Sequence, residues 1–172
     1  KVSQNELIKV LSICRGAGIE FIDTAQAYGD SESRLGALCD DGHFKLITKI
    51  GSGLDSGFFE KRVTQLVLQS CKRLNQSNLY AIMLHDPEVL FGESANKIIS
   101  DLIFLKDQNI VSKIGVSIYS PDILDDILKL LDIDIIQAPF NIFDQKILAS
   151  GWSKKLKERG VEIHTRSVFL QG

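Results

Sequence analysis

Four ionisable side chains stand at or close to the ends of three short apolar runs. Asp23 closes the first run, and Tyr28 follows it by five residues. Lys49 closes the second run, and His85 comes directly after the third. Taken singly, such residues are most often a cap, a partly buried aromatic, a solvated strand end and a hydrogen-bonded loop histidine. Taken together, they form a set whose chemical roles fit one another.

The four side chains could together donate a proton. A phenol with an ordinary pKa of about 10 is a poor acid near neutrality, and a neighbouring ammonium lowers that pKa by stabilising the phenolate. Lys49 is expected to lower the pKa of Tyr28 in this way, while Asp23 keeps Lys49 charged and in position. His85 would orient a carbonyl oxygen or join the proton relay. The set predicts a proton donor that faces a bound carbonyl, as reduction by hydride transfer from a nicotinamide requires.

The elements that must position these residues alternate between helices and strands. Apolar residues at helical spacing give way repeatedly to short β-branched runs bounded by Gly, Asp or Pro. The predicted strands are residues 19–23, 45–49, 81–84, 114–117, 135–137 and 162–165. The predicted helices are residues 4–15, 32–38, 58–74, 94–106, 121–131 and 145–159. This alternation indicates a parallel sheet with right-handed crossovers and both faces covered.

The residues that end the strands favour a barrel over an open doubly wound sheet, which periodicity alone does not separate. In a parallel barrel the reactive side chains come from the C-terminal ends of several strands. Here a polar or ionisable residue ends each of the six predicted strands: Asp23, Lys49, His85, Ser117, Gln137 and Arg166. The predicted fold class is therefore α/β, a (β/α)8 TIM barrel, with residues 1–172 in a single domain.

Composition limits the partners of the protein. The chain has 172 residues, of which 44% are hydrophobic and 24% are charged, with a net charge of −2. That balance is typical of soluble globular proteins and gives no chain-wide reason to expect nucleic acid or an anionic membrane as a partner. No apolar run approaches the roughly 20 residues that span a bilayer. Cys14, Cys39 and Cys71 are widely spaced, which favours reduced thiols in the cytoplasm over a disulfide framework or a metal site.

Longer motifs around these residues resemble the aldo-keto reductase family. The most specific is the stretch at residues 21–36, which contains FIDTA, YGDSE and LG. Further segments resemble the family in the same order along the chain: ITK at 47–49, LHDP at 84–87, IGVS at 114–117, QAPFN at 137–141, RS at 166–167 and QG at 171–172. The resemblance covers effectively the whole chain.

The resemblance implies an NAD(P)H-dependent reductase of an aldehyde, ketone or sugar-like carbonyl. It implies a catalytic tetrad, with Tyr28 as the general acid, that consists of Asp23, Tyr28, Lys49 and His85. It implies a cofactor site, for NADPH with NADH left open, that consists of Asp23, Ser117, Gln137, Arg166, Ser167, Phe169 and Gly172.

Individual roles in the cofactor site follow from the same resemblance. Ser117 and Gln137 would hydrogen-bond the nicotinamide carboxamide. Arg166 stands where the family usually has an aromatic residue stacked on the nicotinamide ring, and a planar guanidinium can stack in a similar way. The residues expected to border the pyrophosphate are Ser167, Phe169 and Gly172.

Two departures from the family pattern matter. Ile118 stands where the family commonly has Asn after the serine, so one contact to the carboxamide is expected to be lost. The six predicted strands correspond to about strands 2 to 7 of the barrel, with strand 1, strand 8 and the last helices missing. Six strands cannot close an eight-stranded barrel, so residues 19–22 and 162–165 are expected to be unpaired edges, and the chain as given is expected to be inactive.

Two other functions stay open. The aldo-keto reductase fold also occurs in non-catalytic subunits that sense nucleotides or regulate a partner, and fold does not fix function. A truncated product that acts as an interaction module is the second alternative. Tight cofactor binding without turnover, together with co-purification of a larger partner, would separate a sensing subunit from an enzyme. The sequence leaves the specific substrate and the oligomeric state open.

Overall fold

The sheet contains six parallel strands in the order in which they occur along the chain. The computed structural model describes residues 2–39, 41–51 and 62–170. Within these residues each strand pairs with the next one, from β1 to β6. The strands are β1 (Phe21–Asp23), β2 (Lys45–Ile50), β3 (Leu79–Leu84), β4 (Val111–Ser117), β5 (Ile135–Pro139) and β6 (Glu162–Arg166). All six predicted strands are confirmed, although β1 begins later, and β3 and β4 begin earlier, than the sequence indicates.

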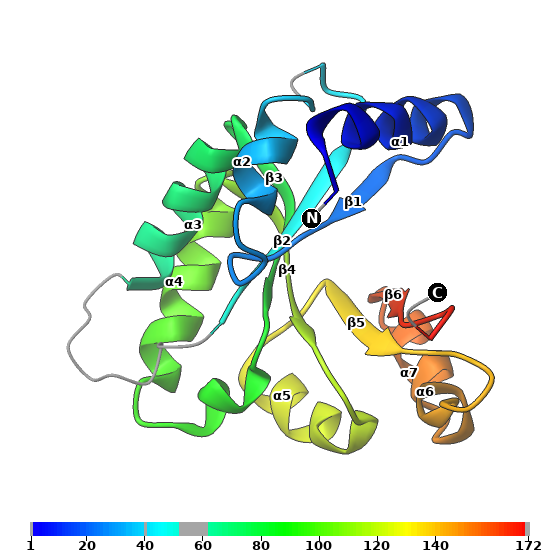
Figure 1. Cartoon of the computed structure of the whole chain (residues 1–172). Helices are drawn as coiled ribbons and strands as arrows, with labels where there is room; N and C mark the ends of the chain where they lie inside the picture. The colour runs from blue at the N-terminus through cyan, green and yellow to red at the C-terminus, as the bar shows by residue number, and fades with distance from the viewer. Residues whose placement is uncertain (1, 40, 52–61, 171–172) are drawn as a thin grey trace.

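The helices lie on the outer side of the curved sheet (Figure 1). They are α1 (Gln4–Gly16), α2 (Ser31–Gly36), α3 (Arg62–Leu74), α4 (Ala95–Asp107), α5 (Leu124–Leu130), α6 (Lys146–Ala149) and α7 (Trp152–Glu158), with 3-10 turns η1 (Pro87–Phe91) and η2 (Pro121–Ile123). α1 begins with a capping box, in which the N–H of Glu6 donates to the Ser3 hydroxyl at 3.3 Å and the N–H of Ser3 donates to the Glu6 carboxylate at 2.7 Å. Among the described residues, none of the helices has both the length and the apolar character that crossing a bilayer requires.

Two predicted helices are organised differently in the structure, and part of a third is not described. The helix predicted at residues 145–159 is wrong as a single element, because Gly151 has a φ of 76° and separates α6 from α7. The helix predicted at 121–131 begins as the 3-10 turn η2, with a proline in its first turn. Residues 58–61 of the helix predicted at 58–74 lie outside the described residues.

A contact between the first and last strands shows that the sheet curves. The rings of Phe21 in β1 and His164 in β6 lie 5.2 Å apart, edge to face. In a flat sheet, five strand spacings of about 4.8 Å would separate β1 from β6 by about 24 Å. The curved parallel sheet with helices on its outer face is the arrangement of an incomplete (β/α)8 barrel, and the predicted fold class is confirmed.

Buried side chains fill both faces of the sheet. The larger group lies between the sheet and the helices and includes Leu46 and Ile50 of β2. The smaller group lies on the concave face and consists of Ile47, Ala81, Met83 and Ile135. Because side chains alternate along a strand, Thr48 shares the outer face with Leu46, and Lys49 shares the concave face with Ile47. β2 therefore directs two charged side chains, Lys45 and Lys49, to the concave face, and of these Lys49 is the buried one.

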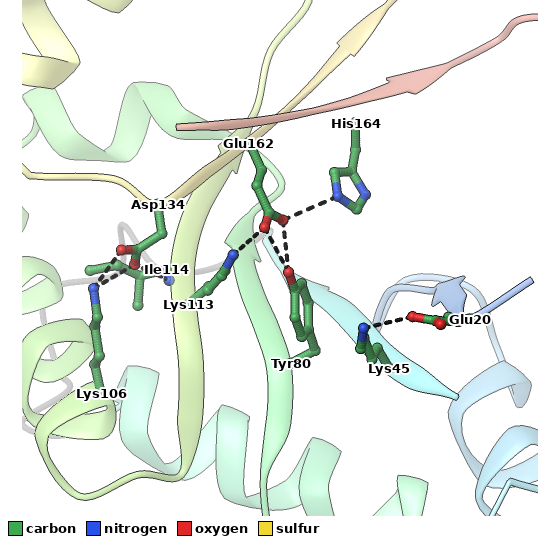
Figure 2. A network of polar contacts seen from close by, with 9 residues as sticks. All are labelled: Glu20, Lys45, Tyr80, Lys106, Lys113, Ile114, Asp134, Glu162 and His164. Carbon is green, nitrogen blue, oxygen red and sulfur yellow. Dashed lines mark hydrogen bonds and ion pairs between the residues drawn. The ribbon is translucent and has the colours of Figure 1, made fainter. Parts of the chain in front are cut away.

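A polar network at the amino ends of the strands connects β6 to β3 and β4 across the concave face (Figure 2). The Glu162 carboxylate accepts hydrogen bonds from the Tyr80 hydroxyl, at 2.8 and 2.9 Å, and from the Lys113 ammonium. His164 Nε2 lies 3.4 Å from the same carboxylate. Burial alone would raise the pKa of Glu162, but the bonds from Lys113 and Tyr80 outweigh it and hold that pKa below its ordinary value. The network stabilises the curvature at the end of the barrel opposite the predicted site.

A substitution at Gly115 tests how closely β4 approaches β5. A Cβ atom at Gly115 would lie 2.0 Å from the carbonyl oxygen of Ile135, which is backbone and cannot rotate away. We expect Gly115→Ala to lower the free energy of unfolding by about 2 kcal/mol or more, because the two strands must move apart. Gly16→Ala is the matched control, since a Cβ there has nothing within 4 Å, and it should be neutral or slightly stabilising. Urea denaturation measures both variants, and wild-type stability of Gly115→Ala would contradict this packing.

Candidate active site

An ion pair between Lys49 and Asp23 forms the centre of the candidate site. Lys49 Nζ lies 2.5 and 2.6 Å from the two Asp23 carboxylate oxygens and 3.3 Å from the carbonyl oxygen of Thr24. The Lys49 side chain is 1% exposed and the Asp23 side chain is 37% exposed. β1 ends at Asp23, which is the register partner of Ile47 on β2. The parallel pairing of β1 with β2 therefore sets the position of both charged groups.

Tyr28 and His85 complete a cluster around Lys49. The Tyr28 and His85 rings lie 6.0 Å apart, edge to face, and Lys49 Nζ is 5.5 Å from the centre of the Tyr28 ring. The backbone N–H of His85 donates to the carbonyl of Ile50 at 2.7 Å, which continues the pairing of β3 with β2. The backbone N–H of Tyr28 donates to the carbonyl of Ala25 at 3.0 Å, which closes a turn after β1. The structure thus brings together the four residues that the sequence singled out.

Burial dominates the electrostatics of the two basic groups. It lowers the pKa of Lys49, and the Asp23 carboxylate opposes that shift. Burial also lowers the pKa of His85, and the positive charges of Lys49 and Arg166 lower it further. Since the ordinary pKa of histidine is about 6.5, His85 is neutral at pH 7.

The expectation that Lys49 lowers the pKa of Tyr28 is wrong for this structure. Burial raises the pKa of the Tyr28 phenol above its ordinary value, and the negative charge of Asp23 raises it further. The Arg166 guanidinium acts in the opposite direction without reversing the shift. The physical reason is that Asp23 compensates the Lys49 charge at close range, so the pair presents little net positive charge to the phenol. Tyr28 therefore keeps its proton at neutral pH.

Ser117, the last residue of β4, lies beside Gln137, the central residue of β5. They are register partners, both are buried, and the Ser117 hydroxyl donates to Gln137 Oε1 at 3.4 Å. That distance is long for a hydrogen bond between oxygens, so the two groups bind each other weakly. A hydroxyl and a primary amide together offer the donor and the acceptor that a carboxamide needs. Ile118, next in the chain, is a buried core residue and offers no such polar group.

Arg166 lies against Tyr119, a residue that the sequence did not single out. The guanidinium carbon is 4.3 Å from the centre of the Tyr119 ring, and Nη2 donates to the carbonyl of Ile118 at 3.3 Å. Tyr119 is otherwise 72% exposed. The contact joins the carboxyl ends of β4 and β6 across β5, and sequence spacing gives no signal for it.

The other predicted cofactor residues follow β6. Ser167 has a φ of 57°, and its carbonyl oxygen accepts a hydrogen bond from Asn141 Nδ2 at 3.2 Å. Phe169 lies in the next turn and is strongly exposed. Gly172 lies outside the described residues. The contact of these residues with a cofactor stays a prediction.

A hollow of about 400 Å³ lies beside His85. The residues that line it are Ala27, His85, Asp86, Pro87, Glu88 and Tyr119. Its size is within the range of small-molecule sites. Asp86 and Glu88 carry no predicted role, although their position directly after β3 is where a parallel barrel exposes polar groups. The hollow leaves room for a small molecule next to one of the four clustered residues.

Comparison with known proteins identifies the relatives of this chain. Residues 1–172 match the profile of the Aldo/keto reductase family. The chain belongs to the aldo/keto reductase family. Among curated relatives, the uncharacterized oxidoreductase YqkF of Bacillus subtilis (strain 168) is 22% identical to this aldo/keto reductase over 180 residues, which cover 98% of this chain and 58% of that protein. The family resemblance of the motifs is confirmed.

Solved structures of aldo-keto reductases share the fold. The holo form of an aldo-keto reductase of Bacillus halodurans matches with a TM-score of 0.81 at 20% identity, over 97% of this chain and 58% of that chain. An aldo/keto reductase of Brucella melitensis matches with a TM-score of 0.73 at 19% identity, over 98% of this chain and 66% of that chain. This aldo/keto reductase chain thus spans 58% of the length of both the B. subtilis and the B. halodurans relatives.

The charge on Lys49 should have a measurable effect on the pKa of His85. Because Lys49 is one of the groups that hold the pKa of His85 below its ordinary value, we expect Lys49→Met to raise that pKa. NMR titration of the His85 imidazole gives the midpoint. Lys113→Met, at the opposite ends of the strands, is the matched control and should leave the midpoint of His85 where it is. An unchanged midpoint in Lys49→Met would mean that the ammonium does not lie beside His85 in solution.

Proposed function

We propose that this aldo/keto reductase reduces an aldehyde, ketone or sugar-like carbonyl to the alcohol, with NADPH or NADH as hydride donor and Tyr28 as general acid. One observation carries the proposal: Tyr28 and His85 are packed around the buried Lys49–Asp23 pair. Membership of the family supports it, because a proton donor and a carbonyl site are what such a reduction requires of the protein. The activity of the whole protein is part of this proposal.

Tyr28 would give its proton to the carbonyl oxygen. Its raised pKa keeps the hydroxyl protonated before the reaction. Hydride addition at the carbonyl carbon leaves an alkoxide, which is a much stronger base than a phenolate, so the proton transfer from Tyr28 is favourable. Of the charged groups near the phenol, the Arg166 guanidinium favours the phenolate that remains, while Lys49 Nζ lies 5.5 Å from the Tyr28 ring centre. Asp23 holds Lys49 in position for this step.

His85 would orient the carbonyl group. It borders the hollow, and its lowered pKa leaves the imidazole neutral at pH 7. A neutral imidazole can donate an N–H hydrogen bond to the carbonyl oxygen while it leaves the proton transfer to Tyr28. The edge-to-face contact between the two rings, whose centres are 6.0 Å apart, keeps the Tyr28 phenol beside the imidazole that lines the hollow.

A nicotinamide, when bound, would supply the hydride. The Ser117 hydroxyl and the Gln137 amide would hold its carboxamide, since they lie side by side and bind each other only weakly. Tyr119 covers one face of the Arg166 guanidinium, and the other face would stack on the nicotinamide ring. The residues that would border the rest of the cofactor are Asp23, Ser167, Phe169 and Gly172.

We propose a cytoplasmic location and a small-molecule carbonyl as the substrate. Cys14 and Cys71 are free thiols in the structure, which fits a reducing compartment. The net charge of −2 supports neither nucleic acid nor an anionic membrane as a partner.

Replacement of Tyr28 tests the proposal. In the full-length protein, we expect Tyr28→Phe to lower kcat by about 100-fold or more, because the general acid is lost, while NADPH still quenches the protein fluorescence as in the wild type. The assay follows NADPH absorbance with a panel of aldehydes, ketones and sugars. Tyr80→Phe is the matched control: it removes a hydroxyl that binds Glu162 at the other ends of the strands and should leave kcat unchanged.

Two results would contradict the proposal. A Tyr28→Phe protein with the wild-type rate would remove Tyr28 from the role of acid. Tight NADPH binding by the wild type without turnover of any carbonyl in the panel would favour a nucleotide-sensing subunit instead. Parallel titrations with NADPH and NADH measure which cofactor the protein prefers.

A further inference from the structure

Glu32 is a carboxylate buried on the outer face of the sheet. It belongs to α2 and is 2% exposed. One of its oxygens accepts a hydrogen bond from the Thr48 hydroxyl at 2.7 Å, and the other accepts one from Arg73 Nε of α3 at 2.5 Å. A buried carboxylate without partners is strongly disfavoured, so these two contacts favour one arrangement of α2, β2 and α3.

The first contact reaches the residue that precedes Lys49. Thr48 is fully buried on the outer face of β2, and Lys49 points to the concave face from the next position along the strand. A shift or rotation of β2 at Thr48 would therefore move the Lys49 side chain as well. Glu32 contacts β2 directly behind the central ion pair.

The second contact holds α2 against α3. The Arg73 guanidinium binds Glu32, and its Nη2 also donates to the Ser70 hydroxyl at 3.4 Å. One turn further along α2, a Cβ at Gly36 would lie 2.2 Å from the carbonyl oxygen of Arg73, so the two helices are in backbone contact. α2 therefore has a single close-packed position on α3.

The loop that carries Tyr28 is held by the same elements. Gln26 Nε2 donates to the Ser70 hydroxyl and to the carbonyl of Leu66, both at 2.8 Å. The backbone N–H of Gln26 donates to the carbonyl of Lys49 at 3.0 Å. The loop then enters α2 at Ser31, three residues after Tyr28. Its start is thus bound to β2 and α3, and its end is bound to them through Glu32.

We propose that Glu32 is a positioning residue of the active site: through Thr48 and Arg73 it fixes the Tyr28 loop and the Lys49 strand relative to each other. The proposal rests on the proposed function, since it assigns Glu32 to the reaction that Tyr28 and Lys49 carry out. A buried ion pair adds little net stability compared with apolar residues of the same shape. The directional contacts of Glu32 therefore serve geometry more than stability.

Kinetics of two Thr48 variants test the proposal. Thr48→Val keeps the shape and removes the hydroxyl that binds Glu32, so we expect kcat to fall by roughly tenfold or more, with KM for NADPH unchanged. Thr48→Ser keeps the hydroxyl and should restore kcat. Asp134→Asn is the control for general destabilisation, because Asp134 likewise accepts hydrogen bonds from a lysine and a strand N–H, but at the amino end of β5. Its kcat should stay at the wild-type value.

A second measurement does not depend on turnover. If Thr48→Val releases Lys49 from its position, the ammonium contributes less to the low pKa of His85, and the NMR titration midpoint of His85 should rise. Thr48→Ser should keep the wild-type midpoint, and the ring signals of His43, which lies on the surface, serve as internal reference. Glu32→Gln, the mildest change at the carboxylate, should move kcat and the midpoint in the same directions and replaces Thr48→Val if that variant does not fold.

The outcomes separate this proposal from the proposed function. A wild-type rate and an unchanged His85 midpoint in Thr48→Val would overturn the positioning role and leave the reductase activity standing. Equal losses of kcat in Thr48→Val and Asp134→Asn would also overturn it, because the effect would then be one of stability. If the wild type reduces no carbonyl, the proposed function fails, and the His85 midpoint alone supports or overturns the positioning role.

Discussion

The site depends on keeping a lysine ammonium charged where almost no water reaches it. Transfer of such an ion out of water costs several kcal/mol, roughly, even after the protein relaxes. The two contacts of Lys49 with Asp23, at 2.5 and 2.6 Å, and the carbonyl of Thr24 offset that cost. Burial has the larger effect on the pKa of Lys49, which therefore lies below its ordinary value. The same pairing explains why the phenol of Tyr28 is not acidified before a substrate arrives.

The alternation of side chains along β2, the curvature of the sheet and a polar network at its other end set the surroundings of that pair. Alternation along β2 turns Lys49 inward and Thr48 outward, so one strand connects the concave site to the helices behind it. Curvature of the sheet brings the loops after β1, β3 and β4 to the hollow beside His85. The Glu162 network stabilises the opposite end of the barrel. The Glu162 network and the proposed active site thus lie at opposite ends of the same strands, as stabilising and reactive residues do in other parallel barrels.

The sequence predicts the parts of this arrangement that follow from its periodicity and from the parallel topology of the strands. Alternating helices and apolar runs predict six parallel strands, and the convergence of strand ends predicts that Asp23, Lys49 and His85 meet. The pKa of Tyr28 and the contact of Arg166 with Tyr119 were not predictable, because both depend on distances between segments far apart in the chain. The break between α6 and α7 was missed because a left-handed glycine inside a helical pattern leaves the apolar spacing intact.

The most direct test of this account is a double-mutant cycle on kcat with Asp23→Asn, Lys49→Met and the combined variant in the full-length protein. If Asp23 acts through Lys49, removing the second member of the pair adds little to the loss caused by the first, and the double variant should be about as slow as the slower single variant. Losses that multiply in the double variant would show that the two residues act independently. That result would contradict the central place of their ion pair.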